Sequence, residues 1–329
     1  MSVSHPFKRG RFAELPARPR RPHHYFDSPA REVVVNSAAF GAVRTHYREL
    51  GSGPPLLLVH GLMTTSYSWR YVMDDLARDH RVIVPDLPGA GRSSKPDVRY
   101  SADALARFVL EFQAALGLRG CQVVGNSLGG LLCMRAVLVD PGAFSRVVNV
   151  HSPAPPHGRY RALHAALSLP GARSLLSWWI RRAPLRWAHK NVHYHDESLK
   201  SLEEASEYGD PLATPEGARA FIHFLYDTFA PGDMAAFVKT LAERRDAGQA
   251  FPVPLLLLYS RQDPLVLPAV GEELAALVPD ARLEWLEDTS HFAHVDTPEA
   301  VLASLRGFLG EATAPPVKAK PSKRAATGG

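Results

Sequence analysis

The most constraining feature of the sequence is a serine that lies between two glycines, at the junction of two patterned segments. Gly125, Ser127 and Gly129 match the pattern G-x-S-x-G. Residues 122–124 before the serine are mainly apolar, as in a buried strand, and residues 131–139 after it have helical spacing. Glycines on both sides permit a sharp turn that a Cβ atom would obstruct. The pattern therefore predicts a serine hydroxyl raised above a sheet, at the start of a helix.

Apolar runs recur along the chain and alternate with segments of helical spacing. The predicted strands are a hairpin at 33–35 and 42–50, then residues 56–59, 81–86, 122–124, 147–150, 255–259 and 283–286. The predicted helices are residues 101–117, 128–140 and 298–309. Strands that are apolar on both faces and alternate with helices are typical of parallel sheets. We therefore expect an α/β fold with a doubly wound, mostly parallel sheet.

One long stretch interrupts this alternation. Residues 153–250 are punctuated by prolines, helical in pattern and rich in aromatic and basic side chains, which predicts an inserted helical cap. The α/β core would then comprise residues 32–152 and 251–310. Residues 1–31 are expected to form a basic, flexible N-terminal extension, and residues 311–329 a disordered, basic C-terminal tail.

Composition narrows the classes of function. Residues 1–31 and 311–329 carry more positive charge than the whole chain's +5, so the remaining body is net negative and nucleic-acid binding is not expected. There is no apolar leader after Met1 and no 18-residue apolar run, which favours a cytoplasmic location. Cys121 and Cys133 lie in apolar runs and are expected to be buried thiols.

Two later residues could activate the serine. A serine hydroxyl is a weak nucleophile at neutral pH and needs a base, which in turn needs a carboxylate to orient it. Asp263 follows the predicted strand 255–259, and His291 follows the predicted strand 283–286. Because the carboxyl ends of parallel strands meet at one edge of a sheet, Ser127, Asp263 and His291 are predicted to form a catalytic triad.

Other groups compete for these roles. Asp288 and Asp296 flank His291 and stay open as alternative acids, although neither follows a buried strand as Asp263 does. His294 is interpreted as structural.

A histidine-rich stretch raises the question of a metal. His189, His193 and His195 invite that interpretation, with the first two on one helix face. No Glu follows His189 as a zinc protease motif requires, so no metal is predicted.

The cap carries aromatic side chains that could contact an apolar ligand. Trp178, Trp179, Phe221 and Phe224 are predicted to line the substrate pocket. Residues 174–187 also combine tryptophans with arginines, as helices on membrane surfaces do. A peripheral membrane contact through the cap is therefore the alternative interpretation.

These motifs together resemble the α/β-hydrolase superfamily over residues 32–310. The resemblance rests on His60-Gly61, the loop at 86–93, the Gly125 to Gly130 turn, and the order Ser127, Asp263, His291. It implies a serine hydrolase without a cofactor that cleaves a carboxylic ester of a mainly apolar small molecule or lipid. It also implies that the backbone N–H groups of Leu62 and Leu128 bind the oxyanion.

The superfamily hosts several reactions, so alternatives stay open. Epoxide hydrolases and haloalkane dehalogenases of this fold use an aspartate where this chain has Ser127, which disfavours both. C–C hydrolases of meta-cleavage products share the Gly-Asn-Ser-x-Gly-Gly turn, but their usual glycine-rich segment after His-Gly is replaced by residues 62–65. A C–C hydrolase and a weakly catalytic ligand-binding protein are the alternatives, and the sequence leaves the oligomeric state open.

Overall fold

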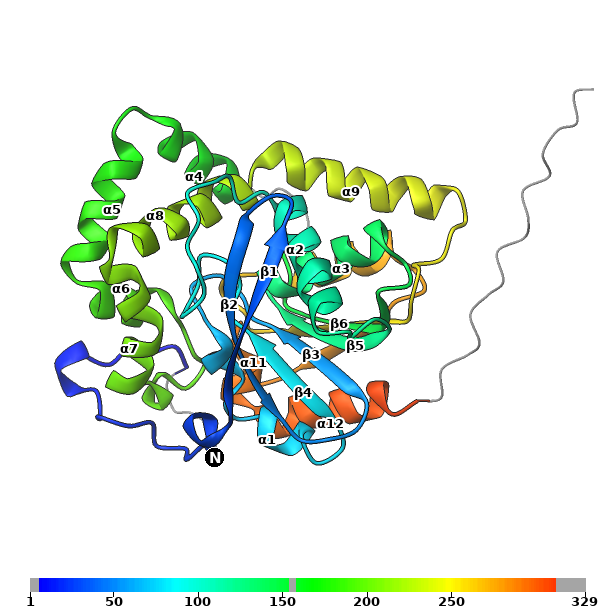
Figure 1. Ribbon diagram of the computed structural model, residues 1–329, viewed down its shortest axis with the longest axis horizontal. Coiled ribbons are helices and arrows are strands. Elements are labelled where there is room, and N and C mark those ends of the chain that lie inside the picture. The colour runs from blue at the N-terminus through cyan, green and yellow to red at the C-terminus, as the bar shows by residue number, and fades with distance from the viewer. Residues whose placement is uncertain (1–5, 154–157, 312–329) are drawn as a thin grey trace, which may run out of the picture.

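The computed structural model describes residues 6–153 and 158–311, and at its centre lies an eight-stranded sheet (Figure 1). The strands are β1 Ala30–Ser37, β2 Gly41–Leu50, β3 Pro55–Val59, β4 Arg81–Pro85, β5 Cys121–Asn126, β6 Phe144–Val150, β7 Leu255–Ser260 and β8 Arg282–Leu286. They are arranged in the order β1-β2-β4-β3-β5-β6-β7-β8. The β1/β2 and β2/β4 pairs are antiparallel and the others are parallel. The predicted mostly parallel α/β sheet is confirmed.

Helices cover both faces of this sheet. One face packs against α2 Ala102–Ala115, α3 Leu128–Val139 and α10 Pro268–Leu277, and the other against α1 Met73–Leu76, α11 Ala293–Asp296 and α12 Pro298–Leu309. In β3, Leu57 and Val59 belong to the first core, whereas Leu56 and Leu58 belong to the second. Successive side chains of a strand point to opposite faces, so a strand buried on both sides needs the continuous apolar run seen in the sequence.

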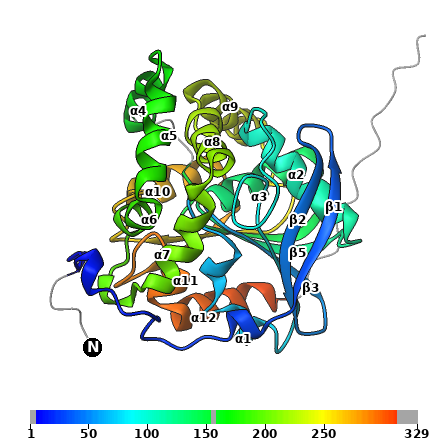
Figure 2. The same ribbon diagram turned by 60° about the vertical axis from the view of Figure 1, so that its left-hand side comes forward.

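The helices between β6 and β7 form the cap and part of the core (Figure 2). They are α4 Gly158–Ser168, α5 Ala172–Arg182, α6 Pro184–Asn191, α7 Leu202–Gly209, α8 Pro215–His223 and α9 Pro231–Asp246, with a π-helical turn at Phe224–Thr228. Short 3-10 turns lie at Phe12–Glu14, Tyr25–Asp27, Ser66–Trp69, Glu197–Leu199 and Asp210–Ala213. Met234, Phe237 and Leu241 of α9 join the main core, as does Ala220 of α8. None of the helices in the described ranges combines the length and apolarity that crossing a bilayer requires.

The N-terminal segment differs from the flexible extension expected for residues 1–31. Within the described part, the carbonyls of Pro16 and Ala17 accept hydrogen bonds of 2.8 and 3.1 Å from backbone N–H groups at the start of α7. Tyr25 is fully buried, and its hydroxyl lies 2.7 Å from Ser66 Oγ. These contacts fix a segment whose basic, proline-rich composition is typical of a free tail. Apart from residue 311, the predicted C-terminal tail lies outside the described residues.

A buried ion pair joins the cap to the core. Arg70, which follows the turn at Ser66–Trp69, donates from Nη2 to Glu204 Oε2 of α7 at 2.6 Å. The Tyr194 hydroxyl donates to the same oxygen at 2.6 Å. The Arg70 guanidinium also lies 4.4 Å from the ring centroid of Tyr67. Both charged side chains are almost inaccessible to water, so each depends on the other for compensation of its charge.

Removing one partner should therefore destabilise the whole protein. We expect Arg70→Met to lower the free energy of unfolding by about 3 to 5 kcal/mol, because Glu204 would stay buried without its cation. Chemical denaturation followed by circular dichroism measures this loss. Arg78→Met is the matched control, since Arg78 is 74% exposed in its pair with Asp75 and should cost less than about 1 kcal/mol. Equal losses in the two variants would contradict this account.

Candidate active site

Ser127 occupies a strained turn between β5 and α3. Its backbone has φ 54° and ψ −118°, in a region that side chains with a Cβ atom rarely adopt. The flanking glycines explain how the turn is possible. A Cβ atom at Gly125 would overlap the backbone of Gly129, and a Cβ atom at Gly129 would overlap the carbonyl of Val59 in β3. The turn thus lies directly against the sheet, with the serine at its tip.

Asp263 and His291 meet where the sequence predicts. Each lies in the loop after its strand, β7 or β8, and His291 Nδ1 donates to Asp263 Oδ2 at 2.7 Å. The other carboxylate oxygen accepts the backbone N–H groups of Leu265 and Val266 at 2.6 and 2.9 Å. Burial alone would raise the pKa of Asp263, but His291 and these hydrogen bonds hold it below its ordinary value. An ionised Asp263 keeps the proton of His291 on Nδ1, which leaves Nε2 free to act as a base.

Ser127 and His291 face the same cavity, which has a volume of about 390 Å³. Its lining is mainly apolar and comes from the core loops and from the cap. The cap supplies Tyr160 and Leu163 of α4, Leu176 of α5, Trp187 and Asn191 of α6, and Phe221, Leu225 and Phe229 around α8; Arg159 is also in the lining. Leu62, Met63, Leu265, Val266 and Phe292 come from the core loops. A cavity of this size and polarity suits a small, mainly apolar molecule.

Further residues help to position the serine and the histidine. The sequence analysis did not single them out. Asn126 Nδ2 donates to the His291 carbonyl at 3.0 Å, and Ser152 Oγ donates to the Ser127 carbonyl at 2.7 Å. The Tyr259 hydroxyl in turn donates to the Ser152 carbonyl at 2.7 Å. Residues next to a G-x-S-x-G serine are natural candidates for such roles, but their partners lie too far along the chain to be read from it.

The loop after β3 packs against the serine. A Cβ atom at Gly61 would lie 3.1 Å from Ser127 Cβ, so the Gly61-Leu62 segment runs beside the predicted nucleophile. Leu62 lines the cavity, and Leu128 is the first residue of α3, where backbone N–H groups have no partner within the helix. Both residues thus lie near Ser127, and their role as oxyanion donors stays a prediction.

His60 shapes this loop rather than taking part in the triad. Its Nε2 accepts the backbone N–H of Leu87 at 3.0 Å, so Nδ1 carries the proton and donates to the Gly61 carbonyl at 2.8 Å. Asp86 organises the neighbouring loop by accepting the backbone N–H groups of Ser66 and Arg92 at 2.8 and 2.9 Å. The 86–93 segment thus serves as a scaffold beside the site.

Only part of the predicted substrate lining is found in the cavity. Phe221 lines the cavity. Phe224 does not, and it packs instead against Gly89 and Tyr100. In contrast to the prediction, neither Trp178 nor Trp179 is in the lining of this cavity, and the two side chains are 56% and 51% exposed. The helical spacing of α5 turns Leu176 inward instead.

The competing residues occupy other environments. Asp288 is exposed, and Asp296 accepts the backbone N–H groups of Ser290 and His195 at 2.8 and 2.9 Å. His294 is buried and stacks on Trp69 with ring centroids 4.4 Å apart. Within the described ranges, no three His, Cys, Asp or Glu side chains gather as a metal site would require.

A second histidine is buried behind the triad. His151 follows β6 with φ 57°, is inaccessible to water, and its ring centroid lies 5.7 Å from that of His291. Burial lowers the pKa of His151 to about 4, so this ring is neutral at neutral pH and adds no positive charge beside the catalytic histidine.

The buried imidazole should make stability depend on pH. Above pH 6.5 His151 is neutral in both states, whereas between about pH 6.5 and 4 only the unfolded chain binds the proton. The contribution of His151 to the free energy of unfolding is therefore fully present above this window. It falls by about 1.4 kcal/mol per pH unit as the pH drops through the window. Asparagine tolerates a positive φ, so His151→Asn should fold. In this variant the free energy of unfolding should fall less steeply between pH 6.5 and 4, by about 1.4 kcal/mol per pH unit, as measured by denaturation at several pH values. An unchanged pH dependence in His151→Asn would contradict this account. His24→Asn is the matched control, because His24 is exposed.

Comparison with known proteins agrees with this geometry. Residues 54–298 match the family model described as the alpha/beta hydrolase fold. The chain is 25% identical to 2-hydroxymuconate semialdehyde hydrolase of Pseudomonas sp. (strain CF600), covering 86% of this chain and 95% of the relative. It is 26% identical to 2-hydroxy-6-oxo-6-(2'-aminophenyl)hexa-2,4-dienoic acid hydrolase of Metapseudomonas resinovorans, covering 84% and 90%.

Solved structures give the same result for the fold. A thermophilic esterase from Thermogutta terrifontis superposes with a TM-score of 0.69 at 21% identity, covering 86% of this chain and all of the other. The segment that matches the family model, residues 54–298, includes the serine turn, the Asp263 loop and the His291 loop. It spans well over half of the chain. This chain belongs to the α/β-hydrolase fold family and is a hydrolase.

Proposed function

We propose that this enzyme hydrolyses carboxylic esters of mainly apolar small molecules or lipids through an acyl-enzyme on Ser127. The observation that supports this most strongly is the 2.7 Å bond between Asp263 and His291, beside a cavity that also contains Ser127. No cofactor is needed for this chemistry, because the serine, the base and the backbone donors supply all of its parts.

The proposed reaction has two halves. Ser127 Oγ attacks the ester carbonyl carbon while His291 Nε2 takes the hydroxyl proton, and the amides of Leu62 and Leu128 stabilise the oxyanion. The proton then passes from His291 to the departing alkoxide, which leaves as the alcohol. In the second half His291 activates a water molecule, which attacks the acyl carbon and releases the acid and free Ser127.

A C–C hydrolase of meta-cleavage products is the second candidate. Two relatives bear the names of such enzymes, and both are covered over at least 90% of their length. The same cavity would then hold an anionic dienoate, with Arg159 in the lining as a cation that could pair with its carboxylate. A weakly catalytic ligand-binding protein is the third candidate. The cytoplasmic location of the protein stays a prediction.

One set of assays tests the nucleophile and separates the first two candidates. We expect a fluorophosphonate probe to label the wild type, and both labelling and hydrolysis of p-nitrophenyl esters to vanish in Ser127→Ala. Ser52→Ala, in an exposed turn, is the matched control and should retain both. The specificity constant should rise from acetate to medium chains as each buried CH₂ adds about 0.8 kcal/mol, and then fall once the cavity is full.

Each contrary outcome has a clear meaning. Cleavage of a coloured 2-hydroxy-6-oxo-dienoate without turnover of any ester would favour the C–C hydrolase. Tight binding of an apolar ligand without turnover of either substrate would favour the non-catalytic protein. Labelling that persists in Ser127→Ala would refute Ser127 as the nucleophile.

The orienting carboxylate can be tested separately. We expect Asp263→Asn to lower kcat by about 10⁴, because an amide at this place stabilises the wrong histidine tautomer. The measurement is ester turnover together with the rate of fluorophosphonate labelling. Asp288→Asn is the matched control at an exposed position of left-handed backbone, which asparagine tolerates. A large loss in the control and none in Asp263→Asn would reassign the acid.

A further inference from the structure

The outer edge of the cap exposes an unusual set of apolar side chains. Leu169, Leu175, Trp178 and Trp179 are between 51% and 66% exposed. In the described part of the chain only four other large hydrophobic side chains are comparably exposed, and they are scattered over the rest of the molecule. We call the surface formed by these four residues and the basic side chains of α5 the α5 edge. Exposed tryptophans cost free energy in water, so a contiguous set of this kind indicates a contact surface.

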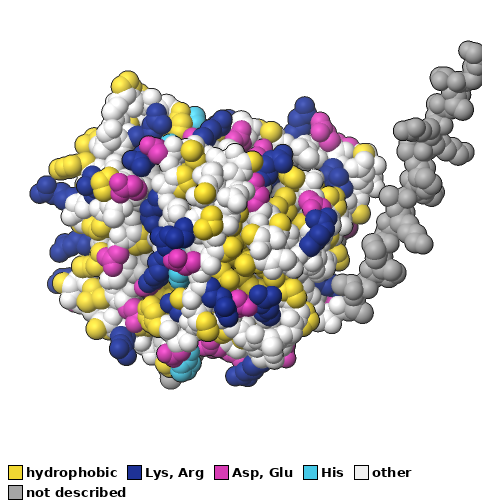
Figure 3. Space-filling model, in the orientation of Figure 1, with side chains coloured by type: hydrophobic (Ala, Val, Ile, Leu, Met, Phe, Trp, Pro, Cys, Tyr) yellow, Lys and Arg dark blue, Asp and Glu magenta, His cyan; other side chains and the backbone are white. Residues whose placement is uncertain are grey.

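The same edge is basic and carries no carboxylate of its own. Residues 158–195 include seven Lys and Arg and no Asp or Glu. The Arg182 guanidinium lies 5.4 Å from the Trp178 ring centroid, and the Lys190 ammonium lies 5.8 Å from the Trp179 ring centroid. In Figure 3, Lys and Arg side chains project along the left-hand border, next to hydrophobic groups, where Figure 1 places α5 and α6. One cation thus lies close to each of the two exposed indoles.

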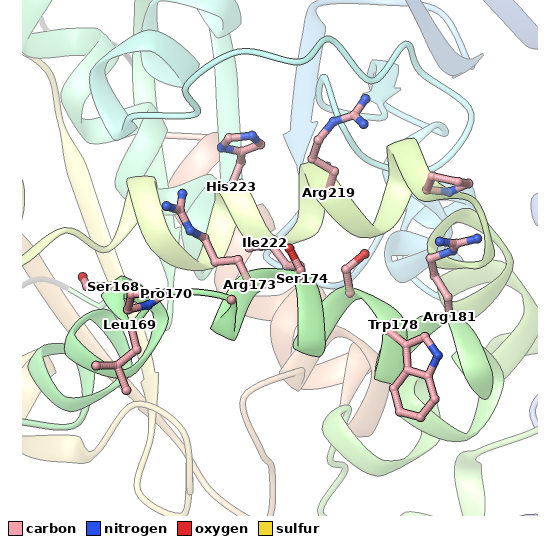
Figure 4. Close-up of a pocket in the computed structure, with 13 residues that line it drawn as sticks. Ser168, Leu169, Pro170, Arg173, Ser174, Trp178, Arg181, Arg219, Ile222 and His223 are labelled. Carbon is pink, nitrogen blue, oxygen red and sulfur yellow. The ribbon is translucent and has the colours of Figure 1, made fainter.

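A groove between α5 and α8 extends the positive surface. It has a volume of about 610 Å³ and is lined by Arg173, Arg181, Arg219 and Trp178 among others (Figure 4). Arg219 is paired with Asp97 at 3.0 Å, whereas Arg181 donates to the Ala213 carbonyl at 3.4 Å and Arg173 lies 4.7 Å from the Tyr226 ring centroid. Arg173 and Arg181 therefore remain available to an anionic group that enters from solvent.

We propose that the α5 edge docks on an anionic lipid bilayer. Tryptophan and leucine side chains would enter the boundary between headgroups and acyl chains, while the arginines would contact lipid phosphates. Helix α5 has the required amphipathic arrangement, since Leu175, Trp178 and Trp179 face outward and Ile180 is buried. Helix α5 also lies at the periphery of the molecule (Figure 2), on the side of the cap away from the sheet.

Docking would bring the bilayer next to the walls of the active-site cavity. Leu175 and Leu176 are neighbours in sequence, yet the first is 66% exposed and the second lines the cavity. Leu163 of α4 and Trp187 of α6 line it as well. An apolar substrate dissolved in the membrane would thus reach Ser127 across a single layer of helices. This consequence rests on the proposed function, whereas the docking itself does not.

Sedimentation with vesicles tests the proposal on the full chain. We expect the protein to co-sediment with phosphatidylglycerol vesicles at about 0.1 M salt, and to bind phosphatidylcholine vesicles far more weakly. Binding should fall at about 1 M salt, because the Debye length then shrinks to about 3 Å. Ser127→Ala should bind like the wild type, which separates docking from the proposed hydrolysis.

Two double variants remove the two components of the surface. Arg181→Gln with Arg182→Gln should lower the partition coefficient about twenty-five-fold, since each arginine near an anionic surface contributes about five-fold. Leu175→Gln with Trp178→Gln should lower it at least about ten-fold through lost apolar insertion. Val139→Gln with Arg107→Gln is the matched control, because it removes one exposed apolar and one exposed basic side chain elsewhere.

Thermal unfolding followed by circular dichroism establishes that each variant is folded. The proposal is overturned if the folded wild type fails to bind anionic vesicles, or if both α5-edge variants bind as the wild type does. It is also overturned if the control pair loses as much binding as they do. Binding to an acidic polypeptide but not to lipid would reassign the edge to a protein partner.

Discussion

The turn at Ser127 is held by backbone packing so close that two positions exclude any side chain. Gly129 meets the carbonyl of Val59 in β3, and Gly125 meets the backbone of Gly129 itself. This contact locks β5, α3 and β3 together at the centre of the sheet, and it forces φ 54° on Ser127. The strain is supported by a core that is buried on both faces of the sheet. Because the serine is held so rigidly, the loops after β7 and β8 need only reach one fixed point.

Those two loops bring a carboxylate and an imidazole from distant parts of the chain to that point. Asp263 is held by two backbone amides as well as by His291, which fixes the direction of its second oxygen. Asn126 holds the carbonyl of His291 from the other side. His151 fills the space behind the triad as a neutral ring, so it adds no positive charge beside His291 at neutral pH. The electrostatics of the site therefore follow from burial and from a few directed hydrogen bonds.

The cap has two surfaces with different chemistry. Its inner surface contributes Leu176, Trp187 and Phe221 to the cavity, and its outer surface exposes Leu175 and tryptophans among arginines. Buried charge fixes the cap in place, since Arg70 and Glu204 connect α7 to the core without access to water. The N-terminal segment adds backbone hydrogen bonds to the same helix.

Local patterns in the sequence were enough to predict the eight strands and their order along the chain, because continuous apolar runs predict buried strands such as β3 and β7. The sequence by itself also determined the strained serine, since G-x-S-x-G between a strand and a helix leaves the backbone little choice. Only the tertiary structure decided which face of α5 is buried, because a helix with apolar groups around much of its circumference does not reveal where its partners lie. The order of the N-terminal segment likewise depends on tertiary contacts. Its basic, proline-rich composition is typical of a free tail, but Pro16 and Ala17 accept hydrogen bonds from the start of α7, nearly 200 residues away along the chain.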